Sequence, residues 1–275
     1  MSPEPATPNE ERTALVTGAS SGIGAAFSKR LAADGYRLIL VARRAERLEV
    51  MAKEFGAEYG AGFEVFPADL TRPEELLAVE DRIAGEPSLE LVVNNAGFGT
   101  LGPLAELDPD GEESEIRLNI LALVRLTRAA LPGLIERGRG GVINVSSMGA
   151  LAPSPYMATY SATKAFVNSF TEGLAGELEG TGVTVQALCP GFTRTEFQEV
   201  AGAGTDDIPS FAWQEAEEVV DASLAGLERG DLVVVPGRAN QAVAAVTAAM
   251  PRSLTRRVLG AAMKRTLARE EEPAP

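Results

Sequence analysis

Short apolar runs alternate with longer amphipathic segments along most of the chain. The apolar runs have the length of β-strands, are rich in Val, Ile and Leu, and cover residues 13–17, 36–42, 62–66, 89–94, 141–146, 182–188 and 231–235. The segments between them repeat apolar residues at helical spacing, over roughly residues 22–34, 44–56, 73–84, 112–136, 155–179 and 214–229. Continuous apolar strands between helices are typical of a parallel sheet covered on both faces. The pattern therefore predicts one doubly wound α/β domain with a seven-stranded parallel sheet.

Three segments fall outside this alternation. Residues 190–213 form a long insert after the sixth predicted strand, and a connection of that length is often a lid over a binding site. Residues 1–12 are polar and Pro-rich, which is typical of a frayed tail. The residues after the last strand add helical material that a seven-stranded domain does not need. We therefore expect a disordered tail over 1–12, one domain over 13–237 and a helical extension over 238–275.

The composition removes several kinds of catalytic site. The chain of 275 residues contains no histidine, which excludes Ser-His-Asp and Cys-His sites and His-ligated metals. Its single cysteine, Cys189, allows neither an internal disulfide nor a thiolate cage, so we expect this residue to be buried and no metal to be bound. Proton transfer must therefore use Tyr, Lys, Ser, Asp or Glu.

Charge and hydropathy limit the partners and the compartment. A formal net charge of −14, from 25 basic and 39 acidic residues, argues against a nucleic-acid partner. The N-terminal residues lack the apolar core of a signal peptide, and no uninterrupted apolar run approaches the ~20 residues that span a bilayer. A single cysteine fits a reducing compartment. We expect the protein to be soluble and cytoplasmic.

A glycine-rich turn follows the first predicted strand. Its sequence is TGASSGIG, residues 17–24, and it leads directly into the first predicted helix. Glycine lets the backbone turn tightly and approach a diphosphate at a helix N-terminus. Glycines also close ordinary strand-to-helix turns, but the position after the first strand of an alternating α/β chain favours dinucleotide binding. The candidate cofactor residues of this turn are Gly18, Ser20, Ser21, Gly22, Ile23 and Gly24.

The end of the second strand predicts which dinucleotide is preferred. A fold that selects NAD places an acidic residue here to hold the ribose 2′-hydroxyl, whereas this chain has Arg43 and Arg44. Because an arginine accommodates a 2′-phosphate, we expect NADP(H) to be preferred over NAD(H), with Arg43 as the phosphate ligand. The alternative, that an arginine merely solvates the start of the next helix, applies more to Arg44. Ser20 or Ser21 is the alternative holder of the phosphate.

The stretch YSATK, residues 160–164, places Tyr160 and Lys164 on one face of a predicted helix. In isolation such a pair is usually a surface contact. Together with the other motifs, however, the chain resembles the short-chain dehydrogenase/reductase family over roughly residues 12–236. The resemblance rests on TGASSGIG, ADL, NNAG, LNIL, NVSS, YSATK and PGFTRT, in the order and at the spacing of the family's motifs. It implies a Rossmann-type fold and an NAD(P)-dependent oxidoreductase.

The resemblance also implies roles for single residues. Tyr160 would be the general acid in reduction and the general base in oxidation, and Lys164 would lower the pKa of that phenol and hold the nicotinamide ribose. Ser147 would donate a hydrogen bond to the substrate oxygen, and Asn119 would anchor a water that relays protons. Besides Tyr160 and Lys164, further cofactor contacts are implied for Asp69, Leu70, Asn95, Ala96, Gly97, Pro190, Gly191, Thr193 and Thr195.

Apolar residues dominate the loops that should face the substrate, at the carboxyl ends of the strands. We therefore expect a hydrophobic ketone or secondary alcohol rather than a sugar phosphate, although Arg194 is a basic exception. For each of these side chains, packing beneath the lid is the alternative to contact with substrate. The apolar candidates are Phe98, Met148, Leu151, Pro153, Tyr156, Phe192 and Phe197.

The C-terminal extension is basic. Residues 252–269 contain six basic and no acidic side chains, and several apolar residues fall near one side of a helix: Leu254, Val258, Leu259, Met263 and Leu267. Such a helix can lie on an anionic membrane surface, but we favour packing on its own acidic domain or on a partner subunit. Members of the family usually dimerise through the helices that correspond to 112–136 and 155–179, so a homodimer is expected, with a tetramer as the alternative.

The function that these observations favour is hydride transfer between NADP(H) and a ketone, an aldehyde or a secondary alcohol. The alternative is a protein that senses dinucleotides without turnover. The presence of Asn119, Ser147, Tyr160 and Lys164 argues against that alternative, because a sensor does not need a complete proton path.

Overall fold

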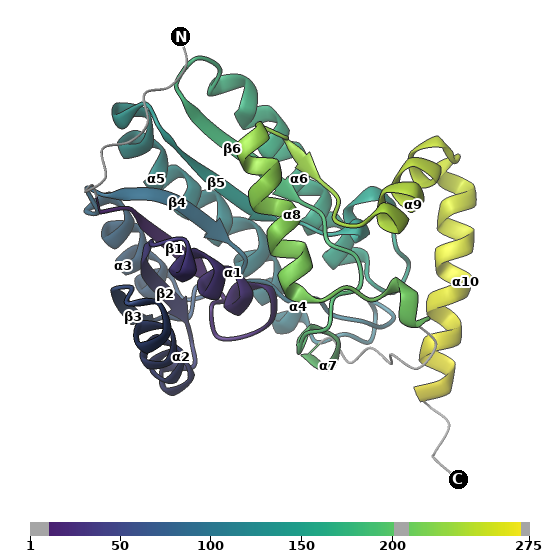
Figure 1. The fold of residues 1–275 in the computed structure, drawn as a ribbon. Helices are drawn as coiled ribbons and strands as arrows, with labels where there is room; N and C mark the ends of the chain where they lie inside the picture. The colour runs from purple at the N-terminus through teal and green to yellow at the C-terminus, as the bar shows by residue number, and fades with distance from the viewer. Residues whose placement is uncertain (1–10, 201–208, 271–275) are drawn as a thin grey trace.

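A seven-stranded parallel sheet forms the centre of the molecule, in the strand order β3-β2-β1-β4-β5-β6-β7 (Figure 1). The computed structural model describes residues 11–200 and 209–270. The strands are β1 Thr13–Thr17, β2 Arg37–Ala42, β3 Phe63–Pro67, β4 Leu89–Asn94, β5 Gly140–Val145, β6 Val183–Leu188 and β7 Val233–Val234. The order reverses between β1 and β4, and in open parallel sheets ligands bind beside the carboxyl ends of the strands at such a reversal.

Helices cover both faces of the sheet. One layer consists of α1 Gly22–Ala33, α2 Ala45–Tyr59 and α8 Ala216–Arg229, and the opposite layer of α3 Pro73–Ala84, α5 Leu123–Arg137 and α6 Ala158–Glu177. The predicted α/β fold with a seven-stranded parallel sheet is therefore confirmed. Its short edge strand β7 pairs only with β6 and is followed by Pro236, which has no backbone N–H to extend the strand.

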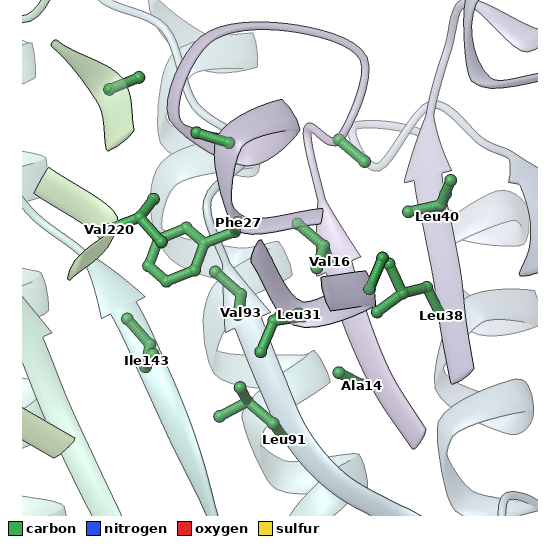
Figure 2. Packing of buried hydrophobic residues seen from close by; sticks show 14 of the residues in the cluster. Ala14, Val16, Phe27, Leu31, Leu38, Leu40, Leu91, Val93, Ile143 and Val220 are labelled. Atoms are coloured by element: carbon green, nitrogen blue, oxygen red, sulfur yellow. The ribbon is translucent and has the colours of Figure 1, made fainter. Parts of the chain in front are cut away.

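The core follows from the alternation of side chains along each strand. Leu38 and Leu40 of β2 face the α1 side, whereas Ile39 and Val41 face the α3 side. Because helices cover both faces, both sets are buried, and the strand is a continuous apolar run. Figure 2 shows the α1 side of this core, where Phe27 of α1 points toward the sheet and α8.

Two predicted helices differ from expectation in ways that affect the site. The segment predicted at 112–136 is one helical stretch, in which α4 Pro109–Ile116 and α5 flank a π-helical turn over Arg117–Ala122. A π-helical turn inside a helix is rare and often lies at a functional site. The helix predicted to begin at residue 155 begins at Ala158, because Tyr156 adopts a left-handed backbone with φ of 68°.

The continuous stretch Pro109–Arg137 is long and apolar enough to cross a membrane by length and composition alone. Sheet-covering helices of globular proteins pass the same test. In this chain α5 packs on β4 and α3, which identifies it as a helix of the core layer.

In its described part, the insert after β6 contains two short helices, α7 Phe197–Val200 and a 3₁₀ turn over Ser210–Ala212. The part of the predicted lid at 201–208 lies outside the described residues.

The C-terminal residues form α9 Arg238–Ala249 and α10 Arg252–Glu270 at one end of the sheet (Figure 1). Helix α9 contacts the 3₁₀ turn Met148–Leu151, and Gly260 of α10 lies against Pro155. The apolar stripe expected on α10 is not a buried face, because Leu254 and Val258 are exposed and Thr255 is buried. The side chain of Leu267, which the prediction also included, lies outside the described residues.

Candidate active site

The glycine-rich turn between β1 and α1 is the first part of the site. Gly18 and Gly22 have positive φ, and a Cβ added to Gly24 would lie 2.3 Å from the carbonyl oxygen of Gly18. Only glycine fits such a close approach. Helix α1 begins here without a side-chain cap at Ser21, so its first N–H groups are available to an anion. The turn therefore fits the diphosphate of a dinucleotide, as predicted for Gly18, Gly22 and Gly24.

The residues after β4 fasten this turn to the sheet. The Asn95 side chain donates to the carbonyls of Thr17 (2.9 Å) and Gly18 (3.3 Å), and the N–H groups of Asn95 and Ala96 both donate to the Thr17 hydroxyl at 3.0 Å. Ile23 packs against the core beneath the turn. These three predicted cofactor residues thus have contacts within the protein that hold the turn in place.

The pair Asp69 and Leu70, predicted to contact the adenine, follows β3. Leu70 is buried, and Asp69 accepts hydrogen bonds from the N–H (3.0 Å) and hydroxyl (2.7 Å) of Thr71. Burial alone would raise the pKa of the Asp69 carboxyl, but the Thr71 bonds and the positive charges of Arg43 and Arg72 outweigh it, so the pKa is lowered. Asp69 is therefore an anion at neutral pH.

The two arginines after β2 differ from the prediction. Arg44, which was expected only to solvate the start of α2, reaches back across the glycine-rich turn and donates to Ser20 (3.0 Å) and Ser21 (2.9 Å). Its other end donates to Glu196 at 2.9 Å. Arg43 is exposed, and its charge acts on Asp69. Arg44, the residue at the N-cap of α2, is thus the arginine beside the serines.

Three of the four predicted catalytic residues meet at the ends of β5 and α6. Tyr160 and Lys164 are buried on α6, and Ser147 and Tyr160 both lie beside Gly149, where an added Cβ would be 3.3 Å from the Ser147 hydroxyl oxygen and 3.3 Å from the Tyr160 ring. The Lys164 ammonium donates to the Val145 carbonyl at 2.8 Å and lies 5.9 Å from the centre of the Tyr160 ring. This arrangement places a phenol, a hydroxyl and an ammonium in one buried site.

Asn119 joins them from the π-helical turn. Its amide nitrogen donates to the Phe98 carbonyl (2.8 Å) and the Thr163 hydroxyl (3.1 Å), and its oxygen accepts from the Phe98 N–H (3.2 Å). A Cβ added to Gly97 would lie 2.8 Å from that oxygen and 3.4 Å from the Lys164 nitrogen. Asn119 and Lys164 therefore approach each other at Gly97, which has no side chain to separate them.

Burial determines the protonation states of Tyr160 and Lys164. Burial raises the pKa of Tyr160 to about 12, which the Ser147 hydrogen bond only partly offsets, and burial lowers the pKa of Lys164 to about 8. In the protein alone, desolvation of the phenolate sets the net direction, so the lowering of the Tyr160 pKa expected from Lys164 stays a prediction. At neutral pH Tyr160 carries its proton and is a proton donor.

An acidic pair next to the site was not predicted. Glu115 is fully buried four residues before Asn119, and it accepts from the Thr100 N–H and hydroxyl, both at 2.9 Å. Glu112 accepts from the hydroxyls of Thr100 and Thr159. A hydroxyl has one proton, so Thr100 can contact both carboxyl groups only if one of them is protonated. Burial raises the pKa of Glu115 to about 7. The spacing to Asn119 was the only signal in the sequence.

One aromatic side chain of the insert, Phe197, packs on Tyr160. The Phe197 ring lies 5.5 Å from the Tyr160 ring, between centroids. Phe192 instead packs on Trp213 at 5.8 Å. Arg194 pairs with Glu215 at 2.9 Å, so the one basic candidate of these loops already has an acidic partner.

The PGFTRT segment after β6 runs across the site. Pro190 is buried, and the Thr193 hydroxyl donates to the Gly191 carbonyl at 3.1 Å. Thr195 lies against the glycine-rich turn, since a Cβ added to Gly22 would be 2.8 Å from its methyl group. Cys189 is buried, as predicted.

The sequence of the chain matches a known protein family. Residues 12–206 match the family model described as short chain dehydrogenase. The very-long-chain 3-oxoacyl-CoA reductase of Anas platyrhynchos is 36% identical over 77% of this chain, and the match spans 67% of that relative, about two thirds of its length.

Two solved structures are similar over most of the fold. A short-chain dehydrogenase from Sphingobium yanoikuyae in complex with NADPH is 37% identical, with a TM-score of 0.79, and covers 88% of this chain and 97% of its own. The bulky-bulky ketone specific alcohol dehydrogenase from Comamonas testosteroni is 33% identical, with a TM-score of 0.76, and covers 89% of this chain and 96% of its own.

Proposed function

The chain belongs to the short-chain dehydrogenase family of oxidoreductases, and from this premise we propose that it reduces a hydrophobic ketone or aldehyde with NADPH, or oxidises the corresponding alcohol with NADP. The observation that carries the proposal is the buried Tyr160, which lies beside Ser147 in one site with Lys164 and Asn119. Phenol, hydroxyl and ammonium are the groups that a carbonyl reduction needs when a chain has no histidine.

The chemistry divides between the cofactor and the chain. When bound, the nicotinamide supplies or accepts the hydride. Tyr160, protonated at neutral pH, gives its phenolic proton to the substrate oxygen. The Ser147 hydroxyl stabilises the negative charge on that oxygen. Lys164 holds a positive charge within 5.9 Å of the phenol ring, which stabilises the phenolate that remains.

The preference for NADP(H) is part of the proposal. Arg44 donates to both serines of the glycine-rich turn, and the two residues after β2 are arginines rather than acidic residues. An acidic residue at this position is what selects NAD in folds of this kind. The similar dehydrogenase from Sphingobium yanoikuyae was solved with NADPH, which agrees with this choice.

The substrate class rests on the surroundings of Tyr160. The Phe197 ring packs on the phenol, and the neighbouring loops contribute Phe98 and Met148. Because Glu215 neutralises Arg194, no free cation faces the substrate from the predicted set. An apolar ketone fits these walls better than a carboxylate or a phosphate ester. The similar alcohol dehydrogenase from Comamonas testosteroni is specific for bulky-bulky ketones by its description.

A screen of carbonyls and alcohols tests the proposal. Ketones with two apolar substituents should oxidise NADPH, followed at the nicotinamide absorbance, with NADH as the slower cofactor. Hydroxy acids and sugar phosphates should give lower kcat/KM. NADPH binding without turnover of any carbonyl would contradict the proposal and favour a dinucleotide-sensing protein.

A further inference from the structure

Glu196 forms ion pairs with Arg44, which lies beside the serines of the glycine-rich turn, and with Arg47 of α2. Its carboxylate accepts from Arg44 at 2.9 Å and from Arg47 at 2.5 Å. The hydrogen bond from Arg47, followed by that from Arg44, lowers the pKa of Glu196 against a small opposing effect of burial. Glu196 is therefore an anion held between two cations, and no role in the reaction has been assigned to it.

The donors of Arg44 are almost all engaged. A guanidinium has five N–H groups. Arg44 uses Nε and Nη2 for Ser20, Nη2 again for Ser21, and Nη1 for Glu196. A phosphate prefers two parallel N–H donors from one arginine. Arg44 can offer these only by giving up a present partner, and Glu196 competes with the phosphate for the same charge.

The backbone keeps Glu196 at this place. The preceding residue, Thr195, lies against Gly22 of the glycine-rich turn. The following residue, Phe197, packs on Tyr160. Glu196 thus lies between two contacts that hold its segment beside the glycine-rich turn and beside Tyr160.

We propose that Glu196 is a specificity-determining residue, which competes with the 2′-phosphate of NADP(H) for Arg44 and Arg47 and so narrows the preference for NADP(H) over NAD(H). The inference rests on the proposed function, since it requires NADP(H) to bind at this turn. NAD(H) has no 2′-phosphate and leaves the pair with Glu196 intact. The carboxylate of Glu196 therefore weakens the binding of NADP(H) and leaves the binding of NAD(H) unchanged.

The test is cofactor binding by the variant Glu196→Gln, which keeps the shape of the side chain and removes its charge. Dissociation constants for NADPH, NADH and adenosine 2′,5′-bisphosphate are measured by calorimetry without substrate. NADPH and the bisphosphate should bind roughly two- to fivefold more tightly, the range expected from an exposed ion pair. NADH should change less than about 1.5-fold, which is within the scatter of exposed pairs.

Two controls complete the test: a matched glutamate variant elsewhere on the surface, and the Glu196 variant in a protein that lacks both arginines. Glu113→Gln removes one exposed, Arg117-paired carboxylate from α4 and should leave all three constants unchanged. In an Arg44→Gln, Arg47→Gln background, Glu196→Gln should lose its effect on NADPH. Tight NADPH binding by the wild type that Glu196→Gln does not alter, or an equal gain for NADH, would overturn the inference alone. Absence of NADPH binding by the wild type would overturn the proposed function and the inference with it.

Discussion

At the scale of single residues, burial decides which side chains of the site carry protons. Tyr160 and Lys164 are both buried, and each is pushed toward its neutral form, the phenol to a pKa of about 12 and the amine to about 8. A neutral phenol is ready to donate, and an amine with a pKa near 8 can lose and regain a proton close to neutral pH. The site is therefore suited to reduction, in which the phenol is the proton donor.

Glu115 gives a residue-scale prediction about stability. Its pKa is raised from 4.5 to about 7 in the folded chain, so between these pH values the folded chain binds a proton that the unfolded chain has lost. The free energy of unfolding must then fall as pH rises through this window, by about 3 kcal/mol for a shift of this size. In Glu115→Gln that loss should be absent.

Urea denaturation of both proteins at pH 5 and pH 8 measures the effect. The decrease in unfolding free energy from pH 5 to pH 8 should be larger in the wild type than in Glu115→Gln, while Glu113→Gln should behave as the wild type does. Equal decreases in the wild type and Glu115→Gln would show that Glu115 is already ionised at pH 5.

The two arginines after β2 give a second residue-scale prediction. Arg44→Gln should raise the dissociation constant for NADPH by about tenfold, because a charge-assisted contact to phosphate is lost. Arg43→Gln should raise it less, since the charge of Arg43 acts on Asp69, whereas Arg44 donates to Ser20 and Ser21. Fluorescence titration with NADPH and NADH checks both variants. A larger effect at Arg43, or an equal loss of NADH binding at Arg44, would contradict the assignment.

Sequence motifs located the residues of the site but not all of their contacts. Tyr160, Lys164, Ser147 and Asn119 come together as the motif order predicted. The sequence does not distinguish the adjacent residues Arg43 and Arg44. Their contacts in the structure do, because Arg44 donates to Ser20 and Ser21 while the charge of Arg43 acts on Asp69. Glu115 was missed because a glutamate on a helix is usually exposed, and its burial depends on the loop that carries Thr100.

At the scale of elements, the β1–α1 turn depends on the absence of one side chain. In Gly24→Ala the new Cβ would meet the backbone oxygen of Gly18, which cannot move without shifting the turn. The variant should lose about 1–3 kcal/mol of stability and weaken the binding of both dinucleotides. Gly176→Ala in α6, where a Cβ meets nothing within 4 Å, is the matched control and should be neutral or slightly stabilising. Thermal unfolding and NADPH titration compare the two, and a neutral Gly24→Ala would contradict the close approach.

Element positions were the most predictable feature of the chain. Buried parallel strands must be apolar on both faces, so β1 and β4 are found at the predicted residues and β2 begins one residue later than predicted. The start of α6 was misplaced because the left-handed backbone at Tyr156 is not a conformation that a tyrosine favours in isolation. The π-helical turn around Asn119 leaves no mark in the periodicity of so short a segment.

At the scale of the whole molecule, apolar side chains remain exposed on the outer face of the α5 and α6 layer. Leu121, Ile135 and Phe166 are each exposed by 39% or more, and Phe166 stacks on Phe170 at 5.9 Å. A hollow of about 380 Å³ lies between these two helices. An apolar patch of this kind is typical of an interface. We expect a homodimer through this face.

Light scattering after gel filtration checks the dimer. The wild type should have twice the chain mass of 28.8 kDa, and Phe166→Glu should shift it to the monomer mass. Val50→Glu places the same charge at an exposed valine on α2, in the opposite layer, and should leave the dimer intact. A monomeric wild type, or a dimer that Val50→Glu disrupts, would contradict this interface.

The central claim is that Tyr160 donates the proton in carbonyl reduction, and one variant tests it most directly. Tyr160→Phe removes a single hydroxyl from a buried ring whose other contacts remain. With the best ketone from the screen, kcat/KM should fall by roughly a thousandfold, the typical contribution of a general acid, while the dissociation constant for NADPH changes by less than about twofold. Activity within about tenfold of the wild type, with NADPH binding intact, would contradict the account.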